Sequence, residues 1–270
     1  MNKLNYLKGL TLYLSYLNEA SHITSNLSCL NILDYIYKNI NKDYLIDLRE
    51  NRDYVIHSKG HASLALYVVL FNHNLITKNE LLSYLDDTTL YGGHVTYVKG
   101  KIEFSTGSLG HGLPHGLGVS LYRIRKKIKG NVIVVMSDGE LNEGTTWESA
   151  MFASHHKLNN LIVFLDNNGY QALGKTDDII SNSNINEKFN SFGWEVIEEN
   201  ESTLMKNTTI LRSTNEKPLL VNYKSTKGNE ISFMKGSIDW HYKSLSSELI
   251  DQCLNEIGLS LEDFKKEFGQ

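Results

Sequence analysis

The segment VIVVMSDGELNEGTTWESAMFASHHKLNNLIVFLDNNG, residues 132–169, decides the fold. It contains two short apolar runs, Val132–Met136 and Leu161–Leu165, and polar residues follow each run directly. Continuous apolar runs, as opposed to alternating ones, are typical of strands that are buried on both faces of a sheet. A helical pattern, Asn142–Lys157, lies between the two runs. The segment therefore predicts two parallel strands that are joined by a helix.

The same alternation of strand and helix continues on either side of this segment. Further strands are expected at Tyr54–His57, Trp194–Ile197 and Leu219–Tyr223. Further helices are expected at Leu27–Asn39, Ala62–Phe71, Gly110–Lys127, Asn184–Phe192, Thr203–Thr214, Leu245–Ile257 and Ser260–Phe268. The order predicts an α/β fold with a mostly parallel, twisted sheet and helices on both faces. Because no repeat or linker interrupts the pattern, we expect residues 1–270 to form a single domain.

The composition narrows the class of protein. Of the 270 residues, 41% are apolar and 21% charged, and the net charge of −4 gives no basic footprint for nucleic acid. No apolar stretch approaches the roughly 20 residues that a membrane helix needs. The first 21 residues read as an amphipathic helix and not as a signal peptide. With only two distant cysteines, Cys29 and Cys253, a cytoplasmic protein is expected.

Polar residues at the ends of the two central strands predict a metal site. Asp138 follows the first strand, and Asn168 follows the second, 30 positions later. Neighbouring parallel strands end at the same edge of a sheet, which is where ligands bind in such folds. A carboxylate, an amide oxygen and the backbone carbonyl of Tyr170 would suit Mg²⁺, which also keeps phosphate oxygens in its shell. Gly139 would let a phosphate approach the following helix start.

The alternative is that Asp138 and Asn168 only cap turns, since Asp-Gly and Asn-Gly are common turn formers. The pair, each member directly after a buried strand, favours the metal site. The pattern also resembles the thiamine diphosphate signature, G-D-G followed about thirty residues later by N-N, with Ser137 at the first glycine. Other segments resemble the N-terminal domain of transketolase, in the order of that family: SHITSNLSCLNILDYIY from residue 21, SKGHASLALY at 58–67, GGH at 92–94, STGSLGHGL at 105–113 and ISFMKGSIDWH at 231–241.

The resemblance implies particular site residues. Asp138, Asn168 and the Tyr170 carbonyl would bind Mg²⁺, or Ca²⁺ or Mn²⁺ in its place. Thiamine diphosphate would be contacted by His61, Gly107, Leu109, Asp138, Gly139 and Asn168. Catalytic and substrate-binding residues would be His22, His61, His94 and His241, with Glu143 at the subunit interface. Histidine also suits this chemistry on physical grounds, because it titrates near neutrality and both donates and accepts hydrogen bonds.

The resemblance also implies that the chain acts with a partner. In transketolases, a glutamate that activates the cofactor comes from a later, pyrimidine-binding domain, and this chain ends at Gln270, where that domain would begin. The chain thus resembles the small subunit of a split transketolase. We expect an α2β2 assembly with a C-terminal transketolase subunit, in which a two-carbon ketol unit passes from a ketose donor to an aldose-type acceptor. No nucleic acid or membrane partner is expected.

The acceptor is predicted to be unusual. Transketolases that act on sugar phosphates carry an arginine shortly before the GGH-like segment, but here the stretch is LLSYLDDTTLYGGH, with Asp86 and Asp87 and no arginine. Arginine binds phosphate through a bidentate fork, and two aspartates would repel it. Synthesis of an unusual sugar or polysaccharide is a plausible setting. Whether His111, where the family commonly has glutamine, changes the specificity stays open.

Two other functions and two other motifs fit parts of the sequence less well. An α subunit of a 2-oxo acid dehydrogenase would share the magnesium signature, but it is not expected to carry GHAS, GSLGHG and the terminal WH together. A non-catalytic partner subunit is disfavoured because Asp138 and Asn168 are intact. The glycines of GSLGHGLPHGLG miss the dinucleotide-binding spacing and precede a strand. A metal pair of His57 and His61 lacks a third ligand nearby in the sequence.

Overall fold

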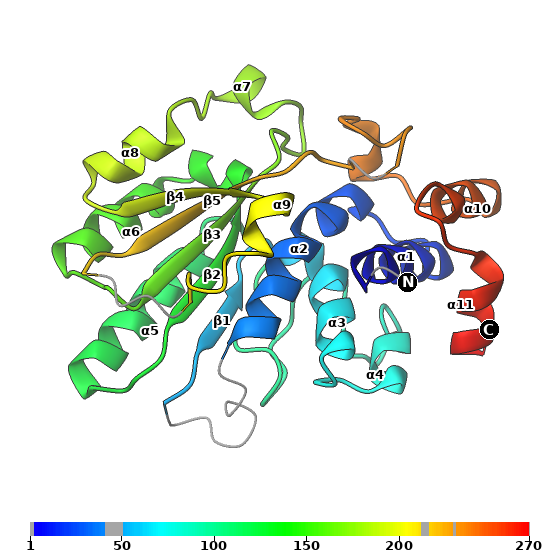
Figure 1. The fold of residues 1–270 in the computed structure, drawn as a ribbon, viewed down its shortest axis with the longest axis horizontal. Coiled ribbons are helices and arrows are strands. Elements are labelled where there is room, and N and C mark those ends of the chain that lie inside the picture. Colours follow the sequence, from blue (N-terminus) through cyan, green and yellow to red (C-terminus); the bar gives the residue numbers. More distant parts are fainter. Residues whose placement is uncertain (1–2, 41–50, 212–215, 229–230, 270) are drawn as a thin grey trace.

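The computed structural model describes residues 3–40, 51–211, 216–228 and 231–269. In this part of the chain, five parallel strands form one twisted sheet in the order β1-β2-β3-β5-β4 (Figure 1). The strands are β1 Tyr54–His57, β2 Val132–Ser137, β3 Leu161–Asn167, β4 Glu195–Asn200 and β5 Leu219–Lys224. All five strands that the sequence predicts are present, which confirms the expected fold class.

Helices cover both faces of the sheet, as Figure 1 shows. Successive side chains of a strand point to opposite faces, so each strand contributes to two apolar cores. In β2, for example, Ile133 and Val135 pack in one core, and Val132 and Val134 pack in the other. The first core lies under α1, α2, α3, α10 and α11, and the second lies under α5, α6 and α8. Every residue of β2 is buried, as its continuous apolar sequence predicts.

Most helices match the predicted ranges within a few residues. The long ones are α1 Lys3–Leu17, α2 Ile23–Asn39, α3 Ser63–Asn72, α5 Gly112–Lys126, α6 Gly144–His155, α8 Ile185–Ser191, α10 Ser247–Glu256 and α11 Leu261–Phe268. The predicted start of α6 at Asn142 is instead a 3₁₀ turn, Asp138–Asn142. The chain therefore makes a tight turn directly after β2, at the position of the proposed metal site.

Two expectations about helices were wrong, and two short helices were not expected. The predicted helix Thr203–Thr214 is only the single turn α9, Glu201–Leu204, within its described part, and residues 212–215 lie outside the described residues. Two short helices, α4 Lys78–Leu82 and α7 Thr176–Ile179, were not expected, because one turn leaves no clear periodicity. Finally, α1 is not amphipathic: every residue from 7 to 15 is buried, since α2, α3, α10 and α11 surround it.

The carboxyl edge of the sheet brings the polar motifs together. Ser137 at the end of β2 is in register with Asp166 on β3, so the residues that follow the two strands are neighbours. None of the described helices is both long and apolar enough to cross a bilayer.

Candidate active site

Asp138 is a buried carboxylate with an oxygen left free. The 3₁₀ turn after β2 places it at the sheet edge, where its Oδ2 accepts hydrogen bonds from the Gly169 amide at 2.7 Å and the Thr176 hydroxyl at 3.3 Å. Its Oδ1 is buried and has no hydrogen-bond partner among the described residues. Burial, reinforced by the nearby Asp166 charge, raises the pKa of Asp138 to about 7. A buried carboxylate oxygen without a donor is suited to an external cation.

Asn168 lies beside Asp138 and is held by a network on β3. Its amide Nδ2 donates to Asp166 Oδ2 at 3.2 Å, and its Oδ1 accepts from the Tyr170 amide at 3.0 Å. The structure thus brings together the three predicted metal-binding residues, Asp138, Asn168 and Tyr170. Their oxygens are hard donors of the kind that Mg²⁺ prefers, so the residues present fit the ion.

Asp166 and Lys59 form an ion pair that is buried on both sides. Lys59 Nζ also donates to the Ser25 carbonyl and the Ser28 hydroxyl, each at 2.9 Å. Burial alone would raise the pKa of Asp166, but the Lys59 charge and the surrounding hydrogen bonds hold it below its usual range. A buried charge pair is stable only when its remaining hydrogen bonds are satisfied, and this one meets that condition.

Four predicted histidines come together from distant parts of the chain. The ring of His22, at the start of α2, lies 5.2 Å from that of His61, 6.1 Å from that of His94 and 5.0 Å from that of His241. His22 is held there by a left-handed backbone conformation, and its amide donates to the His241 carbonyl at 2.9 Å. This group of His22, His61, His94 and His241 is called the histidine cluster below.

Three members of the histidine cluster are kept neutral at pH 7. Burial, with the charges of other histidines, Lys227 and Lys59, lowers the pKa of His22 to about 4 and that of His241 to about 3. Burial and the Lys59 charge also lower the pKa of His61 well below its ordinary value. Neutral imidazoles can both donate and accept hydrogen bonds, which suits them to sugar hydroxyls.

Lys227 connects the histidine cluster to the metal-site loop. Its Nζ lies 2.8 Å from His241 Nδ1 and 6.0 Å from the centre of the Tyr170 ring. Burial and the Lys59 charge lower the pKa of Lys227 to about 8. The predicted histidine and metal-site residues therefore form one continuous region at the edge of the sheet.

The glycine-rich segment before α5 packs closely against the segment after β1. A Cβ on Gly60 would lie 2.6 Å from the Gly107 amide nitrogen, so only glycine fits there. A Cβ on Gly107 would lie 3.1 Å from the His94 ring, which places Gly107 beside the histidine cluster. Leu109 is partly buried in the same segment, and its carbonyl accepts a hydrogen bond from His111 at 3.0 Å.

The remaining predicted residues differ in exposure. Gly139 is partly buried in the turn after Asp138, and a Cβ there would lie 3.4 Å from Gln171. Glu143 is exposed and lies directly before α6. Its side chain packs against Gly110, where an added Cβ would lie 2.6 Å from Glu143 Cβ.

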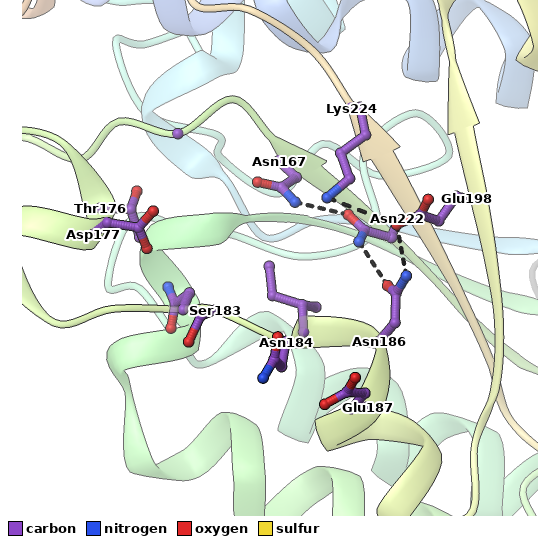
Figure 2. Close-up of a pocket in the computed structure, with 13 residues that line it drawn as sticks. Asn167, Thr176, Asp177, Ser183, Asn184, Asn186, Glu187, Glu198, Asn222 and Lys224 are labelled. Carbon is purple, nitrogen blue, oxygen red and sulfur yellow. Dashed lines mark hydrogen bonds and ion pairs between the residues drawn. The ribbon is translucent and has the colours of Figure 1, made fainter.

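A polar pocket of about 380 Å³ opens at the ends of β3, β5 and β4 (Figure 2). Figure 2 shows a row of side chains along one wall, in which Asn167 donates to Asn222 at 3.0 Å, Asn222 to Asn186 at 2.7 Å and Asn186 to Glu198 at 2.6 Å. These amides satisfy one another, and no residue of the histidine cluster lines the pocket. Gly169 and Thr176, which donate to Asp138, also line the pocket, so it borders the proposed metal site and lies apart from the histidine cluster.

Most of the chain matches the sequence model of one protein family. Residues 10–267 match the family described as "Transketolase, thiamine diphosphate binding domain". The chain belongs to the transketolase family. This match favours the transketolase interpretation over a 2-oxo acid dehydrogenase subunit or a non-catalytic scaffold.

Relatives of similar length support this assignment. An apulose-4-phosphate transketolase subunit of Phocaeicola vulgatus is 34% identical over 93% of this chain and 91% of its own length. The 6-deoxy-6-sulfo-D-fructose transketolase subunit SqwG of a Clostridium species is 29% identical, with 88% of each chain covered. Human transketolase is 28% identical over 92% of this chain but only 40% of its own length.

Among solved structures, the transketolase of Campylobacter jejuni superposes with a TM-score of 0.84. It is 22% identical, and the match covers 99% of this chain and 46% of that chain. The likeness shows that this member of the family has the same fold as the corresponding part of a longer transketolase.

Several residues of the site were missed from the sequence. Lys59, Glu140, Asp166 and Lys227 are buried, and each contacts a predicted segment. Lys59 and Asp166 each lie within two positions of a predicted residue, His61 and Asn168, and this proximity was the available signal. No sequence signal pairs them, because Lys59 and Asp166 are 107 positions apart.

Proposed function

We propose that this chain is the diphosphate-binding subunit of a split transketolase, which transfers a two-carbon ketol unit from a ketose donor to an aldose-type acceptor. The observation that carries the proposal is the buried Asp138 carboxylate. One of its oxygens has no donor among the described residues, and it lies beside Asn168 at the sheet edge that also holds the histidine cluster. The proposal treats residues 1–270 as one domain of a cytoplasmic enzyme.

In this proposal, Asp138, Asn168 and the Tyr170 carbonyl hold a divalent cation, Mg²⁺ or Ca²⁺ or Mn²⁺ in its place, which binds the diphosphate. The free Oδ1 of Asp138 supplies a carboxylate ligand. The Asp166 carboxylate fixes Asn168 by accepting from its Nδ2, which leaves the Asn168 oxygen as the only ligand atom of that side chain. Gly107, Leu109, Gly139 and His61 would contact the cofactor.

Thiamine diphosphate, when bound, supplies the chemistry for breaking and forming a carbon–carbon bond next to a carbonyl. The chain's own residues bind and orient the sugar. His22, His94 and His241 would hydrogen-bond its hydroxyls, and the neutral state of His22 and His241 lets each ring donate through one nitrogen and accept through the other. Because their pKa values lie far below 7, His22 and His241 are weak bases, so hydrogen bonding to the sugar is the role that suits them.

Lys227 fixes which nitrogen of His241 carries the proton. A lysine ammonium can only donate, so His241 Nδ1 accepts its hydrogen bond and the ring proton lies on Nε2. His241 would therefore present an N–H donor at Nε2. This arrangement suits an imidazole that binds a hydroxyl or carbonyl oxygen of the sugar.

A second chain is part of the proposal. Two relatives are named as subunits, and they match this chain over about nine-tenths of their length, as components of a split enzyme would. The partner would carry the pyrimidine-binding domain and the glutamate that activates the cofactor, in an α2β2 assembly. The exposed Glu143 would lie at a subunit interface.

The substrate class of the proposal is an unusual sugar. The names of two relatives specify apulose 4-phosphate and 6-deoxy-6-sulfofructose, neither of which is an ordinary pentose phosphate. Both of these sugars carry an anionic group, a phosphate or a sulfonate. In this chain, Asp86 and Asp87 are exposed on the turn between α4 and the GGH segment, so an anionic group of the acceptor would be repelled from that turn.

The test is native mass spectrometry of the protein purified from its own cells with Mg²⁺ and thiamine diphosphate. We expect a complex with a second, different chain that retains the cofactor and loses it on chelation of the metal. A lone chain or a homodimer that turns over ketose would contradict the split enzyme, because the activating carboxylate would then lie within these 270 residues. If the expected complex is found, it is screened for activity with phosphorylated and unphosphorylated aldoses as acceptors.

A further inference from the structure

Glu140 is a fully buried carboxylate that contacts three separate segments of the proposed cofactor site. Its Oε1 accepts hydrogen bonds from the Ser58 hydroxyl and from the Gly110 amide, the latter at 3.1 Å. Its Oε2 accepts from the amide and the hydroxyl of Ser137, at 2.9 and 3.2 Å. The donors come from the loop after β1, the loop before α5 and the end of β2.

Each of these segments carries residues assigned above to the cofactor. Ser58 is three positions before His61, Gly110 directly follows Leu109, and Ser137 directly precedes Asp138. The loops after β1 and before α5 also touch each other, since a Cβ on Gly60 would lie 2.6 Å from the Gly107 amide nitrogen. Close packing sets the distance between the two loops. Their hydrogen bonds to the same carboxylate, that of Glu140, set how both loops lie relative to β2.

The donors to this carboxylate are all neutral groups. Glu140 forms no ion pair in the part of the chain that the structure describes, and each of its carboxylate oxygens accepts two hydrogen bonds. A buried carboxylate depends on such hydrogen bonds, because it has no water to bind in their place. The Glu140 side chain is therefore held by donors from all three segments.

We infer that Glu140 is a positioning residue of the cofactor site, whose carboxylate holds the loops Ser58–His61 and Gly107–Gly110 in register with Ser137–Asp138. The inference rests on the function proposed above. It also explains why serine stands at position 137, where the resembled signature has glycine: the Ser137 hydroxyl is the fourth donor to Glu140, which glycine could not supply.

The decisive variant is Glu140→Gln, which keeps the side-chain size but replaces one oxygen by an NH₂ group. Glutamine must then face at least one donor with another donor, so a loop that carries Ser58, Gly110 or Ser137 has to move. The matched control is Glu148→Gln, the same chemical change at an exposed position of α6. Ser137→Gly removes a single donor and is the milder test if Glu140→Gln does not fold.

Two measurements separate positioning from general stability. The first is titration of the assembled complex with thiamine diphosphate at saturating Mg²⁺, for which we expect about tenfold weaker binding in Glu140→Gln, about twofold to fivefold in Ser137→Gly and no change in the control. The second is hydrogen exchange of this chain without cofactor. We expect faster exchange around Gly110 and Ser137 in Glu140→Gln, with the interior of β2 and β3 as protected as in the wild type.

The outcomes decide between the hypotheses. Wild-type affinity in Glu140→Gln, or exchange that rises equally throughout β2 and β3, would overturn the positioning role. If the wild-type complex binds no thiamine diphosphate, the proposed function fails. The exchange pattern would still report whether Glu140 holds the three segments, because that measurement requires no cofactor.

Discussion

Asp166 and Asp138 are both buried at the same edge of the sheet, but only Asp166 has a cation beside it within the described residues. Asp166 contacts Lys59 and accepts hydrogen bonds from Ser28, Ser225 and Asn168. Asp138 has two donors on one oxygen and, within the described residues, none on the other. Accordingly, the pKa of Asp166 is lowered, and that of Asp138 is raised to about 7.

The difference distinguishes the carboxylate that stabilises the fold from the one that is proposed to bind a ligand. A buried charge needs a counter-charge and complete hydrogen bonding. Asp166 obtains both from the chain itself, so it stabilises the strand ends. Asp138 obtains neither in full, so an external divalent cation would complete its surroundings. Each prediction below breaks or sharpens this comparison, starting with the largest expected effect.

Removal of the internal cation should have the largest effect. Lys59→Met leaves Asp166 buried without a counter-charge, and we expect the free energy of unfolding to fall by about 3–5 kcal/mol. Urea denaturation of the purified chain measures it, with Lys99→Met at an exposed position as the control. The double variant Lys59→Met with Asp166→Asn should recover part of the loss. A single variant as stable as the wild type would show that the ion pair does not matter.

Removal of the Asp138 charge should separate binding from stability. In Asp138→Asn we expect at least about a hundredfold loss of Mg²⁺-dependent thiamine diphosphate affinity, equivalent to about 2.7 kcal/mol. The thermal midpoint of the chain without metal should stay equal or rise, because an incompletely bonded buried carboxylate is removed. Titration of the complex with and without Mg²⁺ tests the first expectation, and thermal unfolding tests the second. A lower midpoint with unchanged affinity would reverse the assignment of the two aspartates.

A single hydrogen bond to Asp166 should contribute more to the free energy of unfolding than a single hydrogen bond to Asp138. Ser225→Ala removes a 2.6 Å hydrogen bond to Asp166 and should cost about 1–2 kcal/mol of unfolding free energy, because the acceptor is charged and buried. Thr176→Val removes a 3.3 Å contact with Asp138 and should cost less than about 0.5 kcal/mol. Denaturation of both variants under one condition gives the comparison. Equal costs would argue that the two carboxylates are bonded alike.

The buried surroundings of the histidine cluster and the cations beside it predict that the stability of the fold depends on pH. The folded-state pKa values of His22 and His241, about 4 and 3, lie below the ordinary histidine value of 6.5. The contribution of these two histidines to the free energy of unfolding is therefore fully present above pH 6.5. It is lost as the pH drops toward 4, because the unfolded chain takes up protons at a higher pH than the folded chain does. Since His22 is partly open to water, solvent weakens the effect, and we expect about 1 kcal/mol for the pair over this range.

Thermal midpoints between pH 7.5 and 4.5 test this expectation. The double variant His22→Gln with His241→Gln should lose less stability than the wild type as the pH falls, whereas His111→Gln, at an exposed histidine, should follow the wild type. Identical pH profiles for all three proteins would mean that the cluster histidines titrate normally.

Much of this fold follows from local patterns in the sequence. The runs VIVVM and LIVFL are continuous and apolar, and both are buried strands as predicted. The helix expected at Thr203–Thr214 failed because polar residues around a single capped turn, α9, imitate a longer helical pattern. The amphipathic interpretation of α1 failed because a helix that neighbours surround buries even Lys8 and Thr11.

The sequence predicts which residues belong to the proposed site, but it does not predict which of them contact one another. Asp138 and Asn168 could be found because strand ends in a parallel sheet share one edge, and the histidines lie in segments that resemble transketolase. Glu140 could not be assigned, because its partners Ser58 and Gly110 lie 82 and 30 positions away. Spacing along the chain carries no information about such contacts.

The sequence by itself determined the strands, most helices, the family resemblance and the positions of the polar motifs. These depend on short-range patterns of apolar and turn-forming residues, which one stretch of chain contains in full. The tertiary structure decided which buried carboxylate has an internal cation and which lacks one, since Lys59 and Asp166 meet only when β1 and β3 are placed on either side of β2. Charge pairing, burial and the gathering of four histidines are properties of distance in space, and only the folded chain sets that distance.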